Sequence, residues 1–485
     1  MSSLKWNILY SGILTVSNYI FPLLVFPYVS RVLGVANIGV CNFVDSILNY
    51  FILFASMGIN SIGVREIAKW KNDRLMLNRT FTSLMLLNGG MTIVASLVLV
   101  GVIFYVPYFY EYKNLMFIGI TKVVFTLFMI EWFFKGMEEF KYITSRTILI
   151  KFCYVLCVFV FVRHSSDYVV FFLLTALLIV FNGLFDIFCA RRYVSLDFSK
   201  LSISQFCGPF MILGIYMFLT SMYTTFNTAF LGFVTDIREV GYYSVSTKIY
   251  TIVIGLFSAF TGVMLPRVSV LLSDNQEGRF NILIAKSFEV LLVFAFPTII
   301  LTEIYAPEII RIIAGREYEA AILPMRIIMP LIFIIGLEQI LVLQVLMPLK
   351  KDKLILINSI VGAAVGILLN FFLVRTYKSV GTAGVWLIAE LSVLLLSYYF
   401  VKRNSPIKFD LSKIKLFISI SLPIVMINIW LRNIIDVKMY GAVIGSFLTL
   451  IYFLLCFKYI LKFEWFDSIV DPFIEKLKWL FIIRK

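Results

Sequence analysis

Long apolar runs follow one another along almost the whole chain, with short polar segments between them. A helix needs about 20 apolar residues to cross ~30 Å of hydrocarbon. Because the runs are unbroken and do not alternate with polar residues, they predict helices and not barrel strands. The pattern predicts fourteen membrane-spanning helices, at 9–29, 40–62, 82–106, 115–134, 147–163, 168–189, 208–233, 243–264, 285–306, 325–347, 354–374, 381–401, 415–431 and 440–460.

Two of these windows, 202 residues apart, carry the same polar stripe. In the first, five side chains fall within roughly 60° of arc at about 100° per residue: Asn42, Asp45, Asn49, Ser56 and Asn60. Adding 202 gives the second stripe, which Lys248 joins: Ser244, Thr247, Thr251, Ser258 and Gly262. Gly39 and Arg65 correspond to Gly241 and Arg267 in the same way. The offset covers an even number of crossings, so we expect two parallel halves with a polar path between them.

The polar segments between the apolar runs predict an all-α integral membrane protein with two six-helix lobes. Residues 1–190 form the first lobe, and the polar segment 191–204 is a cytoplasmic linker. Residues 205–401 form the second lobe, and 402–460 add an extra helix pair. The tail, 461–485, mixes charged and aromatic residues, which is typical of an amphipathic helix at the inner interface.

Composition agrees with this class. Apolar residues make up 61% of the chain and charged residues 15%, against ~25% charged in an ordinary globular domain. The net charge of +15 comes from Lys and Arg concentrated in alternate loops, which predicts that both termini are cytoplasmic. These basic residues are scattered over many short loops, so nucleic-acid binding does not explain them. The six cysteines lie in or beside the windows without metal-ligand spacing.

Five ionisable residues lie well inside predicted helices: Asp45, Lys122, Lys248, Glu338 and Glu390. A charge facing lipid near the bilayer centre costs ~2.5–3.5 kcal/mol. These side chains must therefore face a polar cavity or pair with one another, and packing ion pairs remain an alternative to function. Four further acids lie near helix ends, where interfacial solvation accounts for them: Glu131, Asp186, Glu289 and Glu303.

Missing motifs also limit the function. The chain has no GxxxxGK[ST] phosphate loop, no HExxH and no nucleophile elbow. It also has no large outer loop to house a glycosyltransferase or polymerase site, which disfavours those enzymes. We therefore expect no catalysis, no cofactor and no metal, and energy supplied by an ion gradient, a substrate gradient or a partner. A membrane scaffold would leave the two matched polar stripes unexplained.

Six stretches, in order, carry a resemblance to a known family: FPLLVFPYVSRVLGVANIGVCNF (21–43), GINSIGVREIAK (58–69), EWFFKGMEEFKYIT (131–144), VGYYSVSTKI (240–249), LPRVS (265–269) and APEIIRIIAGREYEAAILPMRIIMP (306–330). Through them the chain resembles the bacterial O-antigen and polysaccharide repeat-unit flippases, a branch of the multidrug/oligosaccharidyl-lipid/polysaccharide exporter superfamily. The resemblance covers at least residues 1–400. Twelve spans would fit that family as well as fourteen.

The resemblance implies two lobes around a central cavity in the bacterial cytoplasmic (inner) membrane. It implies that an undecaprenyl-pyrophosphate-linked oligosaccharide of O-antigen or capsule type moves from the inner to the outer leaflet by alternating access. A polymerase and a chain-length regulator would be protein partners. The alternative function is an ion-coupled exporter of drugs or metabolites.

Carried onto this sequence, the resemblance suggests three groups of site residues. The candidate pyrophosphate partners are Lys248, Arg31 and Lys122, with Arg65 and Arg267 receiving the headgroup at the cytoplasmic mouth. The candidate sugar-binding residues on polar faces are Asn42, Asn49, Thr247, Thr251 and Asn227. The candidate ion-coupling residues are Asp45, Glu338 and Glu390.

Overall fold

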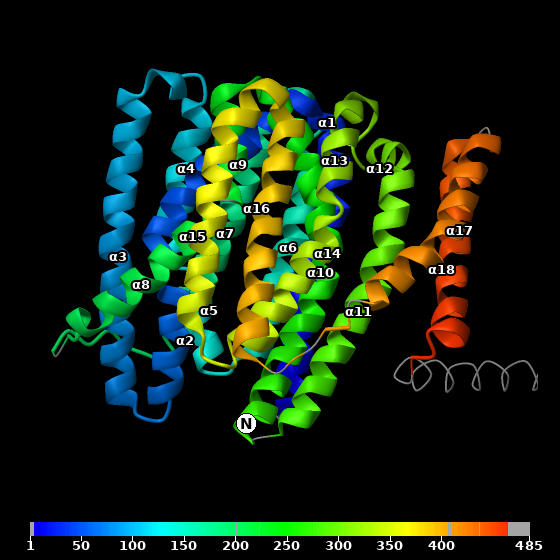
Figure 1. Cartoon of the computed structure of the whole chain (residues 1–485). Coiled ribbons are helices and arrows are strands. Elements are labelled where there is room, and N and C mark those ends of the chain that lie inside the picture. Colours follow the sequence, from blue (N-terminus) through cyan, green and yellow to red (C-terminus); the bar gives the residue numbers. More distant parts are fainter. Residues whose placement is uncertain are drawn as a thin grey trace, which may run out of the picture.

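Helices account for all regular structure in the part of the chain that the structure describes. This computed structural model describes residues 4–199, 201–222, 224–274, 276–405, 407, 409–410, 412–435 and 437–463. Figure 1 shows most helices crossing one slab side by side, as the all-α membrane class requires. The predicted interfacial tail, 461–485, lies outside the described residues apart from its first positions.

The first half of the chain contains seven α-helices and two short 3₁₀ turns. They are α1 (Leu4–Ser56), α2 (Ile59–Trp70), α3 (Arg74–Tyr105), η1 (Pro107–Phe109), α4 (Lys113–Thr126), α5 (Glu131–Gly136), α6 (Phe140–Phe161), η2 (Ser165–Asp167) and α7 (Tyr168–Ala190).

The second half of the chain contains further α-helices and several π-helical segments. Its elements are α8 (Ile203–Ser221), α9 (Thr225–Val234), α10 (Ile237–Ser273), α11 (Glu277–Ile304), α12 (Ala306–Ile313), η3 (Arg316–Ala321), α13 (Ile322–Ile328), α14 (Leu331–Gln339), η4 (Ile340–Leu346), α15 (Asp352–Leu369), η5 (Asn370–Val374), α16 (Arg375–Asn404), α17 (Ser412–Ile434), α18 (Lys438–Leu455) and η6 (Cys456–Ile460).

The helices long and apolar enough to cross a membrane are, in the part of the chain that the structure describes, fewer than the fourteen predicted windows, and the count of fourteen crossings stays a prediction. In the described residues, eleven helices are long and apolar enough to cross a membrane, or twelve if the bent pair Arg316–Ile328 and Leu331–Leu346 is one span. The difference arises because two continuous runs, Leu9–Trp70 and Asp352–Asn404, each contain two of the predicted windows. Each run holds one residue with positive φ, Gly34 (74°) in the first and Lys378 (50°) in the second.

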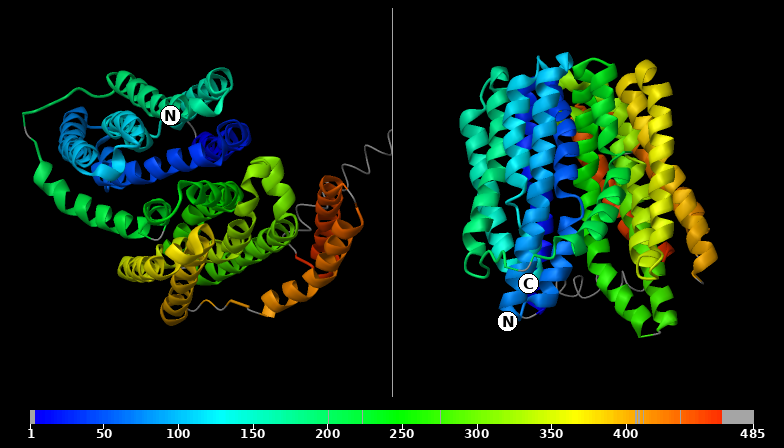
Figure 2. Two further views of the ribbon diagram at one scale, coloured as in Figure 1. Left: turned by 90° about the horizontal axis from the view of Figure 1, so that it is seen from above. Right: turned by 90° about the vertical axis from the view of Figure 1, so that its left-hand side faces the viewer.

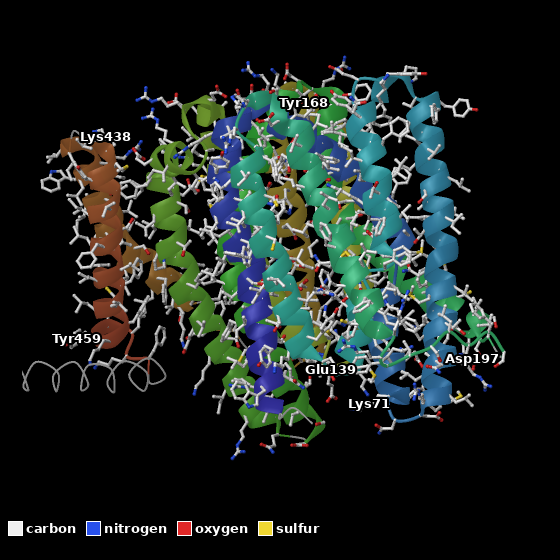
Figure 3. All side chains as sticks on the ribbon, turned by 180° about the vertical axis from the view of Figure 1, so that it is seen from behind. Lys71, Glu139, Tyr168, Asp197, Lys438 and Tyr459 are labelled. Atoms are coloured by element: carbon white, nitrogen blue, oxygen red, sulfur yellow. The ribbon has the colours of Figure 1, made fainter. Side chains whose placement is uncertain are left out.

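At Gly34 the chain folds back on itself. The N-terminus and Lys71 lie at one end of the molecule, whereas Tyr168 lies at the other end (Figures 1 and 3). Asn37 donates a hydrogen bond to the carbonyl of Ser165, close to Tyr168, so the middle of α1 lies at that far end. Glycine is suited to this reversal because it adopts positive φ without steric cost. The two ends are called here the N-terminal end and the opposite end.

Figure 3 also places Glu139, Asp197 and Tyr459 toward the N-terminal end and Lys438 at the opposite end. Seen from above, the helices before the linker form one group and α8 to α16 form a second (Figure 2). The orange and red helices α17 and α18 stand at the margin of the second group. The two-lobed arrangement with an added helix pair is therefore present.

The two lobes touch backbone to backbone where α1 crosses α10. A Cβ atom added to Gly39 would overlap the carbonyl oxygen of Ile237, and one added to Gly241 would overlap that of Val35. Gly241 and Ile237 are the residues 202 positions after Gly39 and Val35. Two reciprocal contacts at the same sequence offset are what a two-fold relation between the halves requires. The repeat seen in the sequence thus has a counterpart in the packing.

A second reciprocal contact lies at the opposite end. The hydroxyl of Tyr108, from η1, donates to the carbonyl of Gly232 at 2.6 Å. The hydroxyl of Tyr318, from η3, donates to the carbonyl of Ser30 at 3.2 Å. Gly232 follows Ser30 by the same 202 residues. Each lobe therefore supplies one tyrosine that bonds to the equivalent carbonyl of its counterpart, and together these contacts close the opposite end.

The added helix pair is attached to the second lobe by polar contacts. Lys413 forms an ion pair with Glu289 of α11 at 2.5 Å, and Arg432 pairs with Glu308 of α12 at 3.3 Å. Asn428 accepts a hydrogen bond from the buried Tyr305 hydroxyl at 2.9 Å. The explanation of Glu289 by interfacial solvation alone is therefore wrong, because its carboxylate holds α17.

The crossing of α1 and α10 generates the first prediction. Gly39→Ala puts a methyl group into the Ile237 carbonyl and should destabilise the protein by about 1–3 kcal/mol. The measurement is the thermal unfolding midpoint of the purified protein. Gly101→Ala in α3 is the control, because a Cβ there meets no atom within 4 Å and alanine is the better helix former. Equal midpoints for the two variants would contradict the close crossing.

Candidate functional site

A cavity of about 200 Å³ lies beside the first polar stripe, on the face of the first lobe where Lys248 of the second lobe joins its lining. Its walls come from both passes of α1, from α6 and α7, and from Lys248 of α10. Asn42, Asp45 and Lys151 contribute the remaining charged and amide groups discussed below. The cavity, called here the inter-lobe cavity, is smaller than the ~300–1,000 Å³ of typical ligand sites. The lobes must therefore separate before a large substrate can enter.

Asp45 is held by an ion pair on the side away from the second lobe. Its Oδ1 atom lies 2.6 Å from Nζ of Lys122, and that Nζ also lies 3.8 Å from the centroid of the Phe172 ring. The Lys122 side chain is only 5% exposed, whereas that of Asp45 is 38% exposed. Lys122 thus lies behind Asp45 and neutralises it. The packing ion pair that the sequence left open is present here.

The charges that remain are positive. With Asp45 neutralised by Lys122, the charged groups lining the inter-lobe cavity are the ammonium groups of Lys151 and Lys248. Lys151 comes from the first lobe and Lys248 from the second, so an anion between them would contact both halves. Lys151 was not among the residues predicted from the sequence. Its signal was its place inside the predicted window 147–163, close to the start of that window, and the structure places it in the middle of α6.

The other residues of the two polar stripes lie in different surroundings. Asn42 lines the inter-lobe cavity and donates to the carbonyl of Ile38. Asn49 is exposed. Thr247 and Thr251 donate to carbonyls of their own helix, those of Ser244 and Thr247. It is therefore Lys248, and not its neighbour Thr247, that shares a cavity with Asp45.

Two of the predicted binding residues lie elsewhere. Arg31 is at the opposite end, where its guanidinium donates to the carbonyls of Arg311 and Ile312 near the end of α12. It thus joins the lobes beside the tyrosine contacts. Asn227 is fully buried in the second lobe and accepts a hydrogen bond from Asn370 at 2.8 Å.

The two arginines related by the 202-residue offset both lie outside the inter-lobe cavity lining. Arg267 is exposed near the end of α10. Arg65 is exposed on α2, pairs with Glu66 at 3.0 Å, and lines a separate cavity with Lys69 and Arg79. The structure therefore divides the predicted basic residues among four places: the inter-lobe cavity, the opposite end, the cavity beside α2, and the end of α10.

A carboxyl pair lies inside the second lobe. Glu338 of α14 and the buried Glu390 of α16 are neighbouring carboxyl groups. Two carboxylates at close range repel each other, which favours a state in which one of them carries a proton. Nε1 of Trp386 donates to Glu390 at 2.9 Å, and the Trp386 ring packs edge-on against Tyr250 of α10. The Tyr250 hydroxyl is buried without a hydrogen-bond partner among the described residues. This cluster can hold and release a proton next to the helix that carries Lys248.

A second buried network was not predicted. The guanidinium of Arg146, on α6, bonds to Glu131 at 2.8 Å and also to the fully buried Asp186 of α7. Tyr142 donates to the same Asp186 carboxylate at 3.3 Å. Interfacial solvation is thus the wrong explanation for Asp186, because this carboxylate ties α7 to α6 through Arg146, which also binds Glu131 of α5. The clue in the sequence was an arginine near two acids at helix ends on the same side.

Metal ligands do not gather anywhere in the described part of the chain: it has no group of three or more His, Cys, Asp or Glu side chains that could hold an ion. The polar chemistry there consists of ammonium and guanidinium groups, carboxyl groups and amides. Such groups bind anions, solvate sugars and carry protons.

Comparisons with known proteins agree with this arrangement. Residues 4–272, more than half of the chain, match the family described as polysaccharide biosynthesis protein. A putative O-antigen transporter of Escherichia coli K12 is 26% identical over 415 residues, covering 83% of this chain and 97% of the relative. A putative O-antigen transporter of Shigella dysenteriae is 23% identical, covering 82% of this chain and all of the relative.

Solved structures show the same fold at low sequence identity. The lipid II flippase MurJ in an inward closed conformation superimposes with a TM-score of 0.75 at 16% identity, covering 93% of this chain and 98% of MurJ. An inward-facing multidrug resistance MATE family transporter of the MOP superfamily gives a TM-score of 0.62 at 11% identity, covering 81% of this chain and 97% of that one.

The Asp45–Lys122 pair generates the second prediction. Asp45→Asn should destabilise more than Lys122→Met, because it leaves the buried Lys122 charge uncompensated, whereas Asp45 without Lys122 can still be hydrated in the cavity. We expect about 1–3 kcal/mol for Asp45→Asn. The double variant should recover part of this loss. Unfolding midpoints of the four proteins form the test, and the reverse order of the single variants would contradict the assignment.

Proposed function

Because the chain belongs to the polysaccharide biosynthesis protein family, we propose that it moves a lipid-linked oligosaccharide across the bacterial cytoplasmic membrane. The cargo is an undecaprenyl-pyrophosphate-linked repeat unit of O-antigen or capsule type, carried from the inner to the outer leaflet. The single observation that supports this most directly is the inter-lobe cavity, where Lys151 and Lys248 leave an excess of positive charge between two lobes.

The cavity chemistry suits each part of such a cargo. A pyrophosphate carries several negative oxygens, and hydrogen bonds between charged partners are about twice as strong as neutral ones. Lys151 and Lys248 are the proposed pyrophosphate partners. Asn42 offers amide hydrogen bonds to the sugar, and the exposed Asn49 and Thr251 extend that polar face along α1 and α10. The prenyl chain stays in the bilayer.

Alternating access follows from how the lobes are joined. At the opposite end they are closed by the Gly39–Gly241 crossing, the two tyrosine–carbonyl bonds and Arg31. Net stabilisation by one hydrogen bond is only about 0.5–1.5 kcal/mol, so such contacts can open and re-form in each cycle. We propose that the N-terminal end faces the cytoplasm, as the basic loops indicate, so that this arrangement is closed to the outside.

Proton coupling is proposed for the Glu338–Glu390 pair. Protonation of both carboxyl groups removes the last negative charge from the cluster, and release of one proton restores it beside Tyr250 and α10. Since α10 also carries Lys248, a change in this cluster can alter how the two lobes meet. Asp45 is bound to Lys122 and is a less available proton carrier.

The ion-coupled exporter of drugs or metabolites remains the second candidate, because the MATE transporter shares the fold. The excess positive charge at Lys151 and Lys248 favours an anionic cargo over a cationic drug.

A polymerase and a chain-length regulator remain proposed partners.

Lys248 supplies the third prediction. In a strain lacking its own repeat-unit flippase, Lys248→Gln should reduce surface polysaccharide about ten- to a hundredfold, the loss of one charge-assisted contact of about 1.5–3 kcal/mol. Lys248→Arg should retain part of the activity. Lys353→Gln, at an exposed lysine in the first turn of α15, is the control for expression and charge. Normal polysaccharide in the Lys248→Gln strain would exclude this lysine from cargo binding.

The carboxyl pair supplies the fourth prediction. Glu390→Gln should abolish acceleration of transport by an imposed proton gradient in proteoliposomes, while exchange of lipid-linked oligosaccharide without a gradient continues. Glu338→Gln should behave in the same way, since the two groups share one proton. Gradient-driven transport that equals wild type in both variants would place the coupling site elsewhere.

A further inference from the structure

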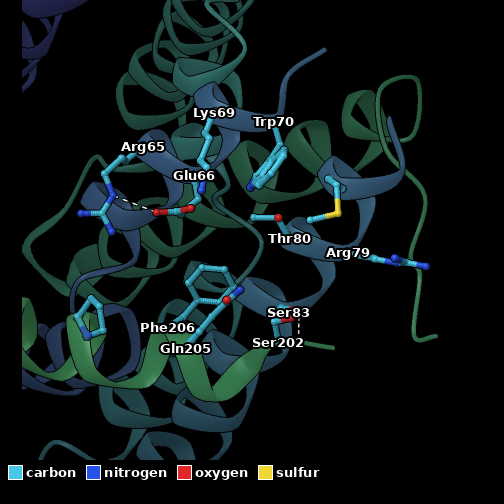
Figure 4. A pocket seen from close by; sticks show the side chains of 12 residues that line it. Arg65, Glu66, Lys69, Trp70, Arg79, Thr80, Ser83, Ser202, Gln205 and Phe206 are labelled. Atoms are coloured by element: carbon cyan, nitrogen blue, oxygen red, sulfur yellow. Dashed lines mark hydrogen bonds and ion pairs between the residues drawn. The ribbon is translucent and has the colours of Figure 1, made fainter. Parts of the chain in front are cut away.

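A second cavity lies at the N-terminal end, where α2, α3 and the start of α8 meet. Its volume is about 410 Å³, within the ~300–1,000 Å³ range of ligand sites. Figure 4 shows Lys69 and Trp70 of α2 facing Thr80 and Ser83 of α3, with Gln205 and Phe206 of α8 beneath them. We call it the basic cavity, because three cations and one acid line it.

The charges of the basic cavity are unevenly compensated. Arg65 pairs with Glu66 at 3.0 Å, and Arg79 pairs with Asp197 of the linker at 3.2 Å. Hydrogen bonds from Ser199 and the ion pair with Arg79 keep the pKa of Asp197 below its ordinary value, so this carboxylate stays committed to Arg79. Lys69 forms no ion pair within the described ranges; its ammonium lies 4.7 Å from the centre of the Trp70 ring. One positive charge therefore remains inside the cavity.

The wall around this charge offers hydrogen-bonding groups. Ser83 and Thr80 present hydroxyls, and Gln205 presents an amide. Ser83 already accepts the backbone N–H of Ser202 at 3.1 Å, which fixes the start of α8 against α3. A phosphate needs this combination of one or two cations and several donors.

Exposed apolar side chains lie on two segments next to the cavity, the linker that carries Asp197 and the helix α8. On the linker, Leu196 and Phe198 are each 61% exposed, and on α8 Ile212 is 67% exposed. Apolar side chains next to basic ones are typical of a segment at the membrane interface, where the surface attracts anionic lipids. A soluble anion would gain nothing from these apolar groups, whereas a lipid would cover them with its acyl chains.

The basic cavity is separate from the inter-lobe cavity. Their linings share no residue. One turn beyond the basic cavity, α8 packs against Gly58 so closely that a Cβ there would lie 2.7 Å from Cβ of Leu213. The two cavities are therefore lined by different residues and separated at this point by a tight helix contact.

We propose that the basic cavity binds the headgroup of an anionic phospholipid. The phosphodiester lies between Lys69 and Arg65 and accepts hydrogen bonds from Ser83 and Gln205, and the acyl chains run along the exposed face of α8. Because α2 and α3 belong to the first lobe and α8 begins the second, the bound lipid links the lobes at the N-terminal end. This inference is independent of the cargo.

The test uses the full chain in nanodiscs of phosphatidylethanolamine with and without phosphatidylglycerol. Phosphatidylglycerol should raise the thermal unfolding midpoint of the wild type by roughly 2–4 °C, the shift that a ligand bound only to the folded state produces. The double variant Arg65→Gln, Lys69→Gln should lose most of this rise, and Lys69→Arg should keep it. Arg191→Gln is the matched control, because Arg191 is exposed after α7 and is absent from the cavity lining.

Native mass spectrometry provides a second readout that does not depend on unfolding. Wild type and Arg191→Gln should retain at least one more phosphatidylglycerol molecule than the double variant. Three results would overturn the proposal. The first is a rise in the unfolding midpoint with phosphatidylglycerol that is as large in the double variant as in the wild type. The second is stabilisation of the wild type by soluble pyrophosphate without phosphatidylglycerol. The third is displacement of bound phosphatidylglycerol by lipid-linked oligosaccharide, which would make the cavity a cargo site.

Discussion

The close crossing of α1 and α10 at Gly39 and Gly241 is the constraint on which the rest of the molecule depends. No side chain larger than hydrogen fits between these backbones in this arrangement, so main-chain atoms place the two lobes relative to each other. Because the contact repeats at an offset of 202 residues, it relates the lobes by an approximate two-fold axis. It brings α1 and α10 side by side, and Asp45 of the first stripe and Lys248 of the second line one cavity.

The ionisable side chains inside the membrane have different kinds of partner in the two lobes. In the first lobe, Lys122 neutralises Asp45, and Arg146 joins Glu131 and Asp186 in a buried network that ties three helices together. In the second lobe, Glu338 and Glu390 are neighbours with no ion-pair partner among the described residues, and Nε1 of Trp386 donates to Glu390. The first arrangement keeps fixed charges, which suits a rigid wall. The second changes charge with one proton, which suits a coupling element.

The surfaces that join the lobes combine small, polar and aromatic groups. Glycine crossings, tyrosine hydroxyls on carbonyls and the Arg31 contact with α12 all occur at the opposite end. Phe233 of α9 also packs there against Phe43, Tyr108 and Phe109 of the first lobe. Separating the lobes therefore breaks hydrogen bonds worth about 0.5–1.5 kcal/mol each and also exposes apolar surface. The alternation between two arrangements proposed for this chain has to offset both costs.

The sequence by itself determined the membrane class, the helical architecture, the parallel halves and the polar face of each, because these follow from hydropathy and from a repeat that any helix geometry preserves. It also identified Asp45, Lys122 and Lys248 as side chains that lipid cannot surround. It did not reveal that Lys122 would neutralise Asp45, that Lys151 would join Lys248, that Arg31 would hold the far end, or that Asn227 would be buried against Asn370. Nor did hydropathy show that two pairs of windows are continuous helical runs bent at Gly34 and Lys378. Those outcomes depend on which helices become neighbours and how far apart they lie, and only the tertiary structure decides that.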